Sequence, residues 1–274
     1  METERLDVLL VLRRFFSSRE KASDAIKAGL VYVENKLVCK PAAKVNSEAV
    51  IHIESGSLPY VSKGGLKLEK GIKAFSLDIR DKILLDVGCS TGGFADCALQ
   101  HGAKFVYGID VGSNQLHESL LHCPQLKYME NLHVKDLNSI HLDNKKMDGI
   151  VVDVSFISST QVFPYVLPFL KEDGFLFTLI KPQFELDSTA LDRNGIVRSE
   201  KSQIIAIQRV LTATKEMKLH LQNIDYAPIT THKKNIEYIA LFRFADINFS
   251  KDLRKMVKEA AEVENRNKNF ELVT

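Results

Sequence analysis

Four charged side chains lie at positions where a parallel sheet would bring them to one edge. Asp153 ends the apolar run GIVVD, and Lys181 directly follows the run FLFTLI. Glu237 begins the run EYIALF, which reaches the same edge if its strand is antiparallel, and Lys67 lies on a helix that enters the domain. Open α/β sheets bind ligands at that edge. Each residue alone fits an ordinary surface charge, but two amines and two carboxylates together predict an acid–base site.

A glycine-rich turn lies between Lys67 and the other three positions. Residues 83–110, ILLDVGCSTGGFADCALQHGAKFVYGID, combine a strand that ends at Asp86, the turn, a helix and a second strand that ends at Asp110. The glycines of the turn are Gly88, Gly92 and Gly93. Glycine allows positive φ and a close backbone approach, and a helix N-terminus offers N–H groups to an anionic group. A carboxylate such as Asp110 can accept hydrogen bonds from ribose hydroxyls.

The turn leaves three kinds of ligand open: a dinucleotide, a nucleotide or S-adenosyl-L-methionine. The sequence has no clean G-x-G-x-x-G, which weakens the dinucleotide reading and the oxidoreductase function that it implies. The pattern D-V-G-x-S-T-G-G-F, with an acid ahead of the first glycine, resembles the cofactor loop of Rossmann-type methyltransferases. We therefore expect S-adenosyl-L-methionine, with a turn that binds no ligand as the alternative.

Length and composition indicate one large domain and one small domain. The chain has 274 residues, of which 45% are hydrophobic and 26% charged, with a mean hydropathy of −0.08. The net charge is only +2, with a pI near 8.2. A role in nucleic-acid binding must therefore depend on a local basic surface.

The cysteines and apolar runs indicate the compartment. The four cysteines, which form no C-x-x-C pair, are Cys39, Cys89, Cys97 and Cys123. We expect reduced thiols, with neither a disulfide nor a metal site. The N-terminus lacks the pattern of a signal peptide, and no apolar run approaches the roughly 18 residues of a membrane helix. The expectation is a cytoplasmic protein that does not enter membranes.

The chain divides at a segment rich in Gly, Pro and Ser, residues 55–62. Before it we expect two helices followed by a small β-ribbon. After it, a basic helix leads into alternating strands and helices, which predict a mostly parallel sheet with helices on both faces. The expected strands are 82–86, 104–109, 126–129, 148–153, 174–180, 220–226 and 236–243. The last 25 residues read as an exposed, charged helix.

Basic side chains concentrate on or between the first two predicted helices. They are Arg5, Arg13, Arg14, Arg19, Lys21 and Lys27. Their spacing fits ordinary solvated charges as well as a phosphate-binding face. The lysine-rich helix Lys63–Lys73 could bridge the two domains along an RNA.

Several motifs in order resemble one family. GGLKL, DVGCSTGGF, DVSFIS, LIKPQFE and NIEYIALF resemble the TlyA, or hemolysin A, proteins, and SREKASDAIKAGLVYVENK resembles their S4 RNA-binding domain. The resemblance covers roughly residues 1–245. It implies an α/β, Rossmann-like, FtsJ-like methyltransferase domain with a seven-stranded sheet, preceded by a small α+β S4 domain. The implied boundaries are 1–58 for the S4 domain, 59–246 for the methyltransferase domain and 247–274 for a charged helical tail.

The resemblance also implies roles for single residues. The family's catalytic tetrad maps to Lys67, Asp153, Lys181 and Glu237. Its cofactor residues map to Asp86, Gly88, Ser90, Gly92, Gly93, Phe94 and Asp110. His133 stands where the family has Asn, near the expected adenine. The RNA-binding set comprises Arg5, Arg13, Arg14, Arg19, Lys21, Lys27 and Lys63.

The implied activity is 2′-O-methylation of ribose in rRNA, on a cytidine of small- or large-subunit rRNA or both. The implied partners are rRNA or ribosomal subunits, without a metal or a membrane. Lys181 is expected to act as general base or to stabilise the forming alkoxide. One alternative is an rRNA-binding assembly factor that has lost catalysis, which the complete tetrad disfavours. The other is a membrane-acting hemolysin, which lacks the spans that a pore requires.

Overall fold

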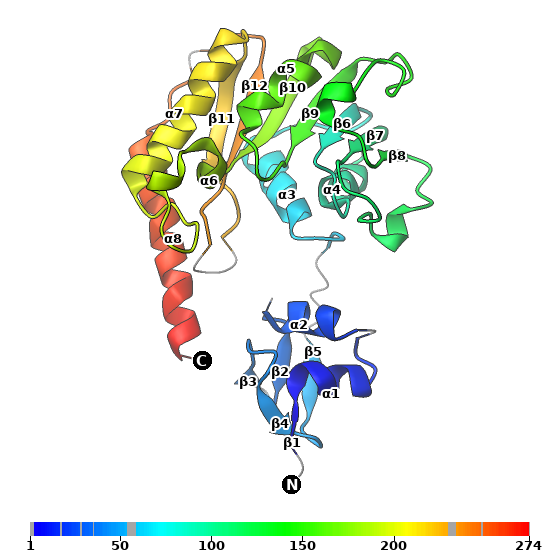
Figure 1. Cartoon of the computed structure of the whole chain (residues 1–274), viewed down its shortest axis with the longest axis vertical. Coiled ribbons are helices and arrows are strands. Elements are labelled where there is room, and N and C mark those ends of the chain that lie inside the picture. The colour runs from blue at the N-terminus through cyan, green and yellow to red at the C-terminus, as the bar shows by residue number, and fades with distance from the viewer. Residues whose placement is uncertain are drawn as a thin grey trace. The chain divides into compact units, whose positions relative to one another are not determined.

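The computed structural model describes residues 3–16, 18–27, 29–34, 36–53, 59–229, 234–247 and 249–273, with side chains up to residue 265. The chain forms two compact units (Figure 1). One comprises Met1–Pro59 with Lys268–Thr274, and the other comprises Tyr60–Asn267. The first half of the segment predicted as a linker, residues 55–58, lies outside the described residues.

The first unit contains the two helices and the small ribbon that the sequence predicts. Its helices are α1 (Leu6–Leu12) and α2 (Arg19–Lys27). Its strands are β1 (Thr3–Arg5), β2 (Val31–Val33), β3 (Lys36–Leu37), β4 (Lys44–Asn46) and β5 (Ile51–Ile53). They form a three-stranded sheet in the order β3-β2-β5 and an antiparallel pair of β1 with β4. The sequence prediction lacked that pair, because three-residue strands carry too little alternation to be recognised.

A charged cluster ties the start of α1 to α2. The carboxylate of Asp7 accepts hydrogen bonds from Arg5 Nε and Nη2, both at 3.0 Å, and from Arg19 Nη2 at 2.9 Å. The Asp7 side chain is 6% exposed. Hydrogen bonds from Arg5, followed by those from Arg19, hold the pKa of Asp7 well below its usual range despite its burial. Two arginines predicted to bind RNA therefore also stabilise this unit.

The second unit is built on a seven-stranded, mostly parallel sheet, which confirms the predicted fold class. Its strands are β6 (Ile83–Val87), β7 (Phe105–Ile109), β8 (Leu126–Met129), β9 (Met147–Val152), β10 (Leu170–Ile180), β11 (His220–Tyr226) and β12 (Tyr238–Arg243). Their order is β11-β12-β10-β9-β6-β7-β8, with β12 antiparallel to both of its neighbours. The chain runs outward in both directions from β6, so the carboxyl end of β6 is the switch point at which such sheets bind ligands.

Helices cover both faces of this sheet (Figure 1). They are α3 (Gly64–Ala74), α4 (Gly93–Gln100), α5 (Phe163–Val166), α6 (Pro182–Glu185), α7 (Glu200–Glu216) and α8 (Leu253–Val273). The connections from β7 to β8 and from β8 to β9 contain only the short 3₁₀ turns η1 (Glu118–Leu120) and η2 (Val134–Asp136). The sequence predicts alternating strands and helices, but no α-helix lies among the described residues between β7 and β8 or between β8 and β9.

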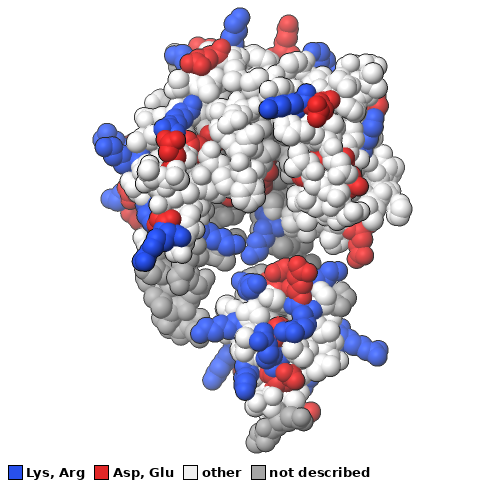
Figure 2. All heavy atoms as spheres, in the orientation of Figure 1, with Lys and Arg blue, Asp and Glu red and all other residues white. Residues whose placement is uncertain are grey.

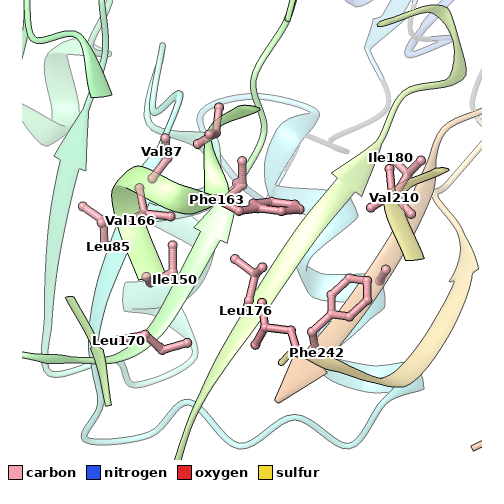
Figure 3. Close-up of a cluster of buried hydrophobic side chains, with 14 of the residues drawn as sticks. Leu85, Val87, Ile150, Phe163, Val166, Leu170, Leu176, Ile180, Val210 and Phe242 are labelled. Carbon is pink, nitrogen blue, oxygen red and sulfur yellow. The ribbon is translucent and has the colours of Figure 1, made fainter. Parts of the chain in front are cut away.

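Two apolar clusters fill the space on the two faces, because successive residues of each strand point to opposite sides. On β6, Leu84 joins the cluster beneath α3 and α4, whereas Leu85 joins the cluster beneath α5 and α7. Figure 3 shows the second cluster, where Phe163 of α5 packs near Ile150 and Leu176 of the central strands.

The C-terminal helix is not simply exposed, as its sequence suggests. Met256, Val257 and Ala260 of α8 are at most 1% exposed and belong to the apolar cluster shared with α5 and α7. The exposed charged residues Arg254, Lys255, Lys258 and Glu259 flank this narrow apolar stripe in the sequence, which hid it from composition-based reasoning.

Asp7→Asn should lower the free energy of unfolding of the first unit by about 1 kcal/mol at pH 7. The effect is small because the two arginines are about half exposed and solvent screens their charges. A depressed folded pKa contributes stability above the unfolded pKa of about 3.9, and this contribution is lost as the pH falls toward the folded value. Denaturant unfolding should therefore give a difference between wild type and variant that shrinks below about pH 4. An equal difference at acidic and neutral pH would rule out this role of the carboxylate.

Candidate active site

The structure brings the four predicted acid–base residues together at the carboxyl edge of the sheet. Asp153 directly follows β9, and Lys181 follows the parallel neighbour β10. Glu237 directly precedes β12, which is antiparallel to β10, so its start lies at the same edge. Lys67 reaches this edge from the first turns of α3.

The four side chains form a continuous chain of ion pairs, called here the quartet. Glu237 Oε2 lies 2.7 Å from Lys67 Nζ, and Lys67 Nζ lies 3.4 Å from Asp153 Oδ2. The other oxygen of Asp153, Oδ1, lies 2.6 Å from Lys181 Nζ. Lys181 is the most buried member, with 9% of its side chain exposed. Asp153 therefore lies between two lysine side chains, and the quartet contains two basic and two acidic groups.

The charge state of Lys67 follows from this arrangement. Burial lowers the pKa of Lys67, but the negative charges of Asp153 and Glu237 outweigh it, and the pKa is raised overall. Lys67 is therefore an ammonium group at neutral pH. It can orient carboxylates and donate hydrogen bonds, but it cannot accept a proton.

A fifth polar group, which the sequence reasoning did not single out, contacts the quartet. Lys181 Nζ donates to Ser155 Oγ over 2.9 Å. Ser155 lies two residues after Asp153 in the motif DVSFIS. Its position just after a predicted strand could have identified it as a further candidate site residue. The next residue, Phe156, has φ +65° and is 91% exposed, and its ring centroid lies 5.3 Å from that of Phe184. A bulky residue in this conformation is uncommon and often marks a functional segment.

The glycine-rich turn has the backbone conformation that its sequence predicts. Gly88 has φ +82° and Gly92 has φ +91°, and Ser90 between them is also left-handed at φ +48°. A Cβ atom on Gly88 would lie 2.6 Å from the carbonyl oxygen of Asp153. Gly93 begins α4, and a Cβ atom there would overlap Ser62 Oγ. The turn thus packs directly against the segment that carries Asp153.

The two acidic residues of this region differ in environment. Asp86 is 0% exposed on β6, neither of its carboxylate oxygens has a hydrogen-bond partner among the described residues, and burial raises its pKa to about 7. Asp110 lies at the end of β7, where Oδ2 accepts from Ser90 N over 2.8 Å and Oδ1 accepts from Gly112 N over 2.7 Å. These bonds fix the Asp110 carboxylate against the turn and leave each oxygen a further lone pair.

The remaining predicted cofactor residues lie apart from the quartet. Phe94 is 3% exposed in α4, with its ring near Phe177 of the sheet. His133 is exposed after β8, and its Nδ1 accepts from Lys135 N over 3.1 Å. β8 pairs with β7, so Asp110, directly after β7, and His133, four residues after β8, follow neighbouring strands.

One cavity of about 840 Å³ connects the turn and the quartet. Its lining includes Gly88, Ser90, Gly93 and Phe94 from the turn and α4. It also includes all four members of the quartet, with Lys63 at the entry to α3. This volume is in the range of small-molecule and cofactor sites.

The groups around this cavity suit S-adenosyl-L-methionine. The turn brings backbone N–H groups and the N-terminus of α4 to a position where a carboxylate can bind. Asp110 is not among the residues that line the cavity, but its carboxylate is bonded to the N–H of Ser90, which does line it, and it can accept from two ribose hydroxyls. Across the described ranges, from residue 3 to residue 273 with the stated gaps, no group of three or more His, Cys, Asp or Glu could hold a metal ion. No helix in those same ranges is long and apolar enough to span a membrane.

The predicted RNA-binding residues of the first unit have different environments. Arg13 donates to the backbone carbonyls of Ala49, at 2.6 Å, and Ser47, so it connects α1 to the segment before β5. Arg14, Lys21 and Lys27 have exposed side chains. Figure 2 shows basic side chains spread over the visible face of this unit, with acidic ones between them.

Comparison with known proteins connects this geometry to a family. The model of FtsJ-like methyltransferases matches residues 60–244, and the S4 domain model matches residues 4–51. Hemolysin A of Brachyspira hyodysenteriae is 37% identical over 87% of the chain and 99% of its own length. The 16S/23S rRNA (cytidine-2′-O)-methyltransferase TlyA of Mycobacterium tuberculosis is 30% identical over 87% of the chain and 89% of its own length. A solved structure from Streptococcus thermophilus that carries a hemolysin name is 32% identical, with a TM-score of 0.77 over 98% of the chain and 99% of its own.

Gly88→Ala should weaken cofactor binding by at least about tenfold, because Ala resists the left-handed conformation and its Cβ would displace the Asp153 carbonyl. Gly29→Ala is a matched control, since Gly29 has a similar φ of +75° but its nearest such contact is 3.9 Å away. Calorimetric titration with S-adenosyl-L-homocysteine measures both variants. An unchanged dissociation constant for Gly88→Ala would show that the turn does not hold the cofactor.

Proposed function

The chain is a methyltransferase of the TlyA, or hemolysin A, family, and on that premise we propose that it methylates the 2′-hydroxyl of a ribose in ribosomal RNA. The observation that carries the proposal is the quartet, which shares one cavity with the glycine-rich turn. A related protein is named as a cytidine-2′-O-methyltransferase of 16S and 23S rRNA, which supports a cytidine as the target nucleotide. Such a substrate implies a cytoplasmic enzyme.

The two parts of the chain would divide the work. Residues 1–58 would bind RNA and residues 59–246 would transfer the methyl group. The helical tail 247–274 would brace the transfer domain, since Met256 and Val257 are part of its core. These limits agree with a match of the FtsJ-like model to residues 60–244.

S-adenosyl-L-methionine supplies an electrophilic methyl group, so the protein must orient a weakly acidic hydroxyl and manage its proton. Lys181 is the group best placed for this task, because its Nζ lies in the cavity between Asp153 and Ser155. In the neutral form it would accept the hydroxyl proton. In the charged form it would stabilise the developing negative charge on the oxygen.

The other members of the quartet would hold Lys181 in place. Asp153 forms an ion pair with Lys181 through Oδ1 and accepts a hydrogen bond from Lys67 through Oδ2, which restricts the plane of its carboxylate. Glu237 holds Lys67 at 2.7 Å. Lys67 would also donate to the ribose or to a phosphate oxygen at the mouth of the cavity.

Cofactor binding is assigned to the turn and to the strand ends beside it. Asp110 would accept from the ribose hydroxyls, and the N–H groups of the turn would bind the methionine carboxylate. Asp86 is buried at the end of β6, two residues before Gly88, and would contribute to cofactor binding through the turn that follows it. His133 would lie near the adenine.

RNA binding is assigned to basic side chains that face solvent. In the first unit these are Arg14, Lys21 and Lys27, with Arg5 and Arg19 contributing from their partly exposed pairs with Asp7. Arg13 would contribute mainly to folding, since both of its described bonds are internal. Such phosphate contacts give affinity and salt dependence rather than sequence choice.

The exposed ring of Phe156 offers a stacking surface for a base that leaves its helix to present the ribose. Its position beside Ser155 places this surface next to the quartet.

Lys181→Ala should lower the rate of methyl transfer at least about 1,000-fold, with the cofactor dissociation constant changed less than about threefold.

Asp110→Ala should instead weaken cofactor binding first, by about tenfold or more, since it removes both oxygens of the carboxylate that accepts from the ribose. Single-turnover assays and calorimetry separate the two effects. Loss of cofactor binding in Lys181→Ala, or its preservation in Asp110→Ala, would reverse the assigned roles.

Phe156→Ala should weaken the binding of the RNA substrate by about 1–3 kcal/mol, the usual contribution of a stacked base. Phe156→Trp should keep the affinity because it retains a flat ring. Ile140→Ala is the control, because Ile140 is also exposed, at 75%, but lies in the connection between β8 and β9 and not beside Ser155. If Phe156→Ala and Ile140→Ala bind RNA equally well, Phe156 is not a stacking surface.

The proposed function as a whole is tested by transfer of labelled methyl groups to isolated 30S and 50S subunits. Label on a ribose, found with wild-type protein and lost with Lys181→Ala, is the expected result, and the labelled subunit identifies the substrate. Normal cofactor binding without label on either subunit would contradict the proposal.

A further inference from the structure

The ammonium group of Lys181 has more hydrogen-bonding capacity than Asp153 uses. It carries three N–H donors. One of them donates to Ser155 Oγ at 2.9 Å. Asp153 Oδ1 lies 2.6 Å from the same Nζ as an ion pair, but this oxygen has no partner with hydrogen-bond geometry among the described residues. Ser155 therefore gives the ammonium group its direction, and Lys181, Asp153 and Ser155 all line the cavity into which a further N–H can donate.

Ser155 reaches Lys181 from a loop that does not have a relaxed backbone. The residue after it, Phe156, has φ +65°, a conformation that costs an L-residue free energy unless the surroundings hold it. The start of the loop is fixed, because Asp153 N donates to the carbonyl of Val87 over 3.0 Å. A second anchor is needed after Phe156.

Glu185 supplies that second anchor. It is only 7% exposed, and its carboxylate oxygens accept three hydrogen bonds from the end of the loop. Oε1 accepts from Ser159 N at 2.9 Å and from Ser159 Oγ at 2.8 Å. Oε2 accepts from Ser158 Oγ. The mechanism proposed above does not use this buried carboxylate.

The helix α6 joins both contacts into one rigid unit. Lys181 is the residue before α6 and Glu185 is its last residue, and Phe184 N donates to the Lys181 carbonyl over 2.9 Å. Arg209 of α7 holds the other end through a 2.8 Å bond to the Glu185 carbonyl. The segment Lys181–Glu185 therefore contacts the loop at two points. Lys181 bonds to Ser155, and Glu185 bonds to Ser158 and Ser159.

We propose that Ser155 and Glu185 are positioning residues for methyl transfer: Ser155 directs Lys181 Nζ toward the substrate oxygen, and Glu185 holds the Ser155 loop in place. The inference rests on the proposed function, because Lys181 is taken as the group that meets the reacting hydroxyl. Without Ser155, Lys181 keeps only its ion pair with Asp153. That contact alone does not fix the orientation of the ammonium group toward the substrate oxygen.

The test compares Ser155→Ala and Ser155→Thr in the full-length protein. Ser155→Ala should lower kcat about 10- to 100-fold, with KM for RNA and the cofactor dissociation constant changed less than about twofold. Ser155→Thr keeps the hydroxyl and should restore most of kcat. Ser188→Ala, at an exposed serine outside the cavity lining, should behave as wild type. A kcat for Ser155→Ala equal to that of wild type would overturn the role of Ser155.

Glu185 is tested by the same split between kcat and KM. Glu185→Gln keeps an oxygen that can accept both bonds from Ser159, so it should retain more activity than Glu185→Ala. Thermal unfolding identifies any loss of activity that comes from loss of the fold. Equal kcat values for Glu185→Ala and wild type, or an equal loss in Gln and Ala variants that remain folded, would overturn the role of Glu185.

A measurement that does not depend on activity separates this inference from the proposed function. Nitrogen-15 NMR detects lysine ammonium groups whose protons are protected from exchange by hydrogen bonds, and Lys181→Arg assigns the Lys181 signal. The signal should be present in wild type and Ser155→Thr, and lost in Ser155→Ala and Glu185→Ala. If wild type transfers no methyl group but shows this pattern, the proposed function fails while the positioning contact stands. An unchanged signal in Ser155→Ala would overturn the contact itself.

Discussion

The bridge that Asp153 makes between Lys67 and Lys181 is the interaction on which the site depends. Removing charges from water is costly, and a buried pair is retained when its geometry compensates that cost. Here two ammonium groups and two carboxylates neutralise one another within 2.6–3.4 Å, with each member supplied by a different element. The sheet and α3 must therefore pack correctly against each other, because otherwise a charged side chain would be buried without its partner.

The same edge of the sheet joins the quartet to the cofactor turn. Gly88 lies against the Asp153 carbonyl so closely that it leaves no room for a Cβ atom. Ser90 N and Gly112 N hold the Asp110 carboxylate at the end of the neighbouring strand. A change in the turn is thus transmitted to the acid–base residues through backbone contacts. This coupling explains why a glycine-rich turn and a charged edge occur in one domain.

Much of this arrangement could be predicted from the sequence. Parallel strands are buried on both faces and therefore stand out as apolar runs, and β8 and β11 have the predicted limits. The quartet was predictable because each member adjoins such a run or the entering helix. Residues without an apolar run beside them were harder to interpret. The buried stripe of α8 lies among charged residues in the sequence. Glu185 resembles an exposed acidic residue in the sequence, and only the structure shows that it binds Ser158 and Ser159. Arg13 is the converse case: the sequence predicts RNA binding from its charge, and gives no sign of its two hydrogen bonds to backbone carbonyls.

The most direct test of the account is a crystal structure with S-adenosyl-L-homocysteine bound. The account predicts that the ribose hydroxyls of this ligand donate to Asp110 and that its sulfur faces Lys181 across the cavity. A ligand whose sulfur points away from the quartet, or whose ribose lies far from Asp110, would contradict the claim that the turn and the quartet form one site for methyl transfer.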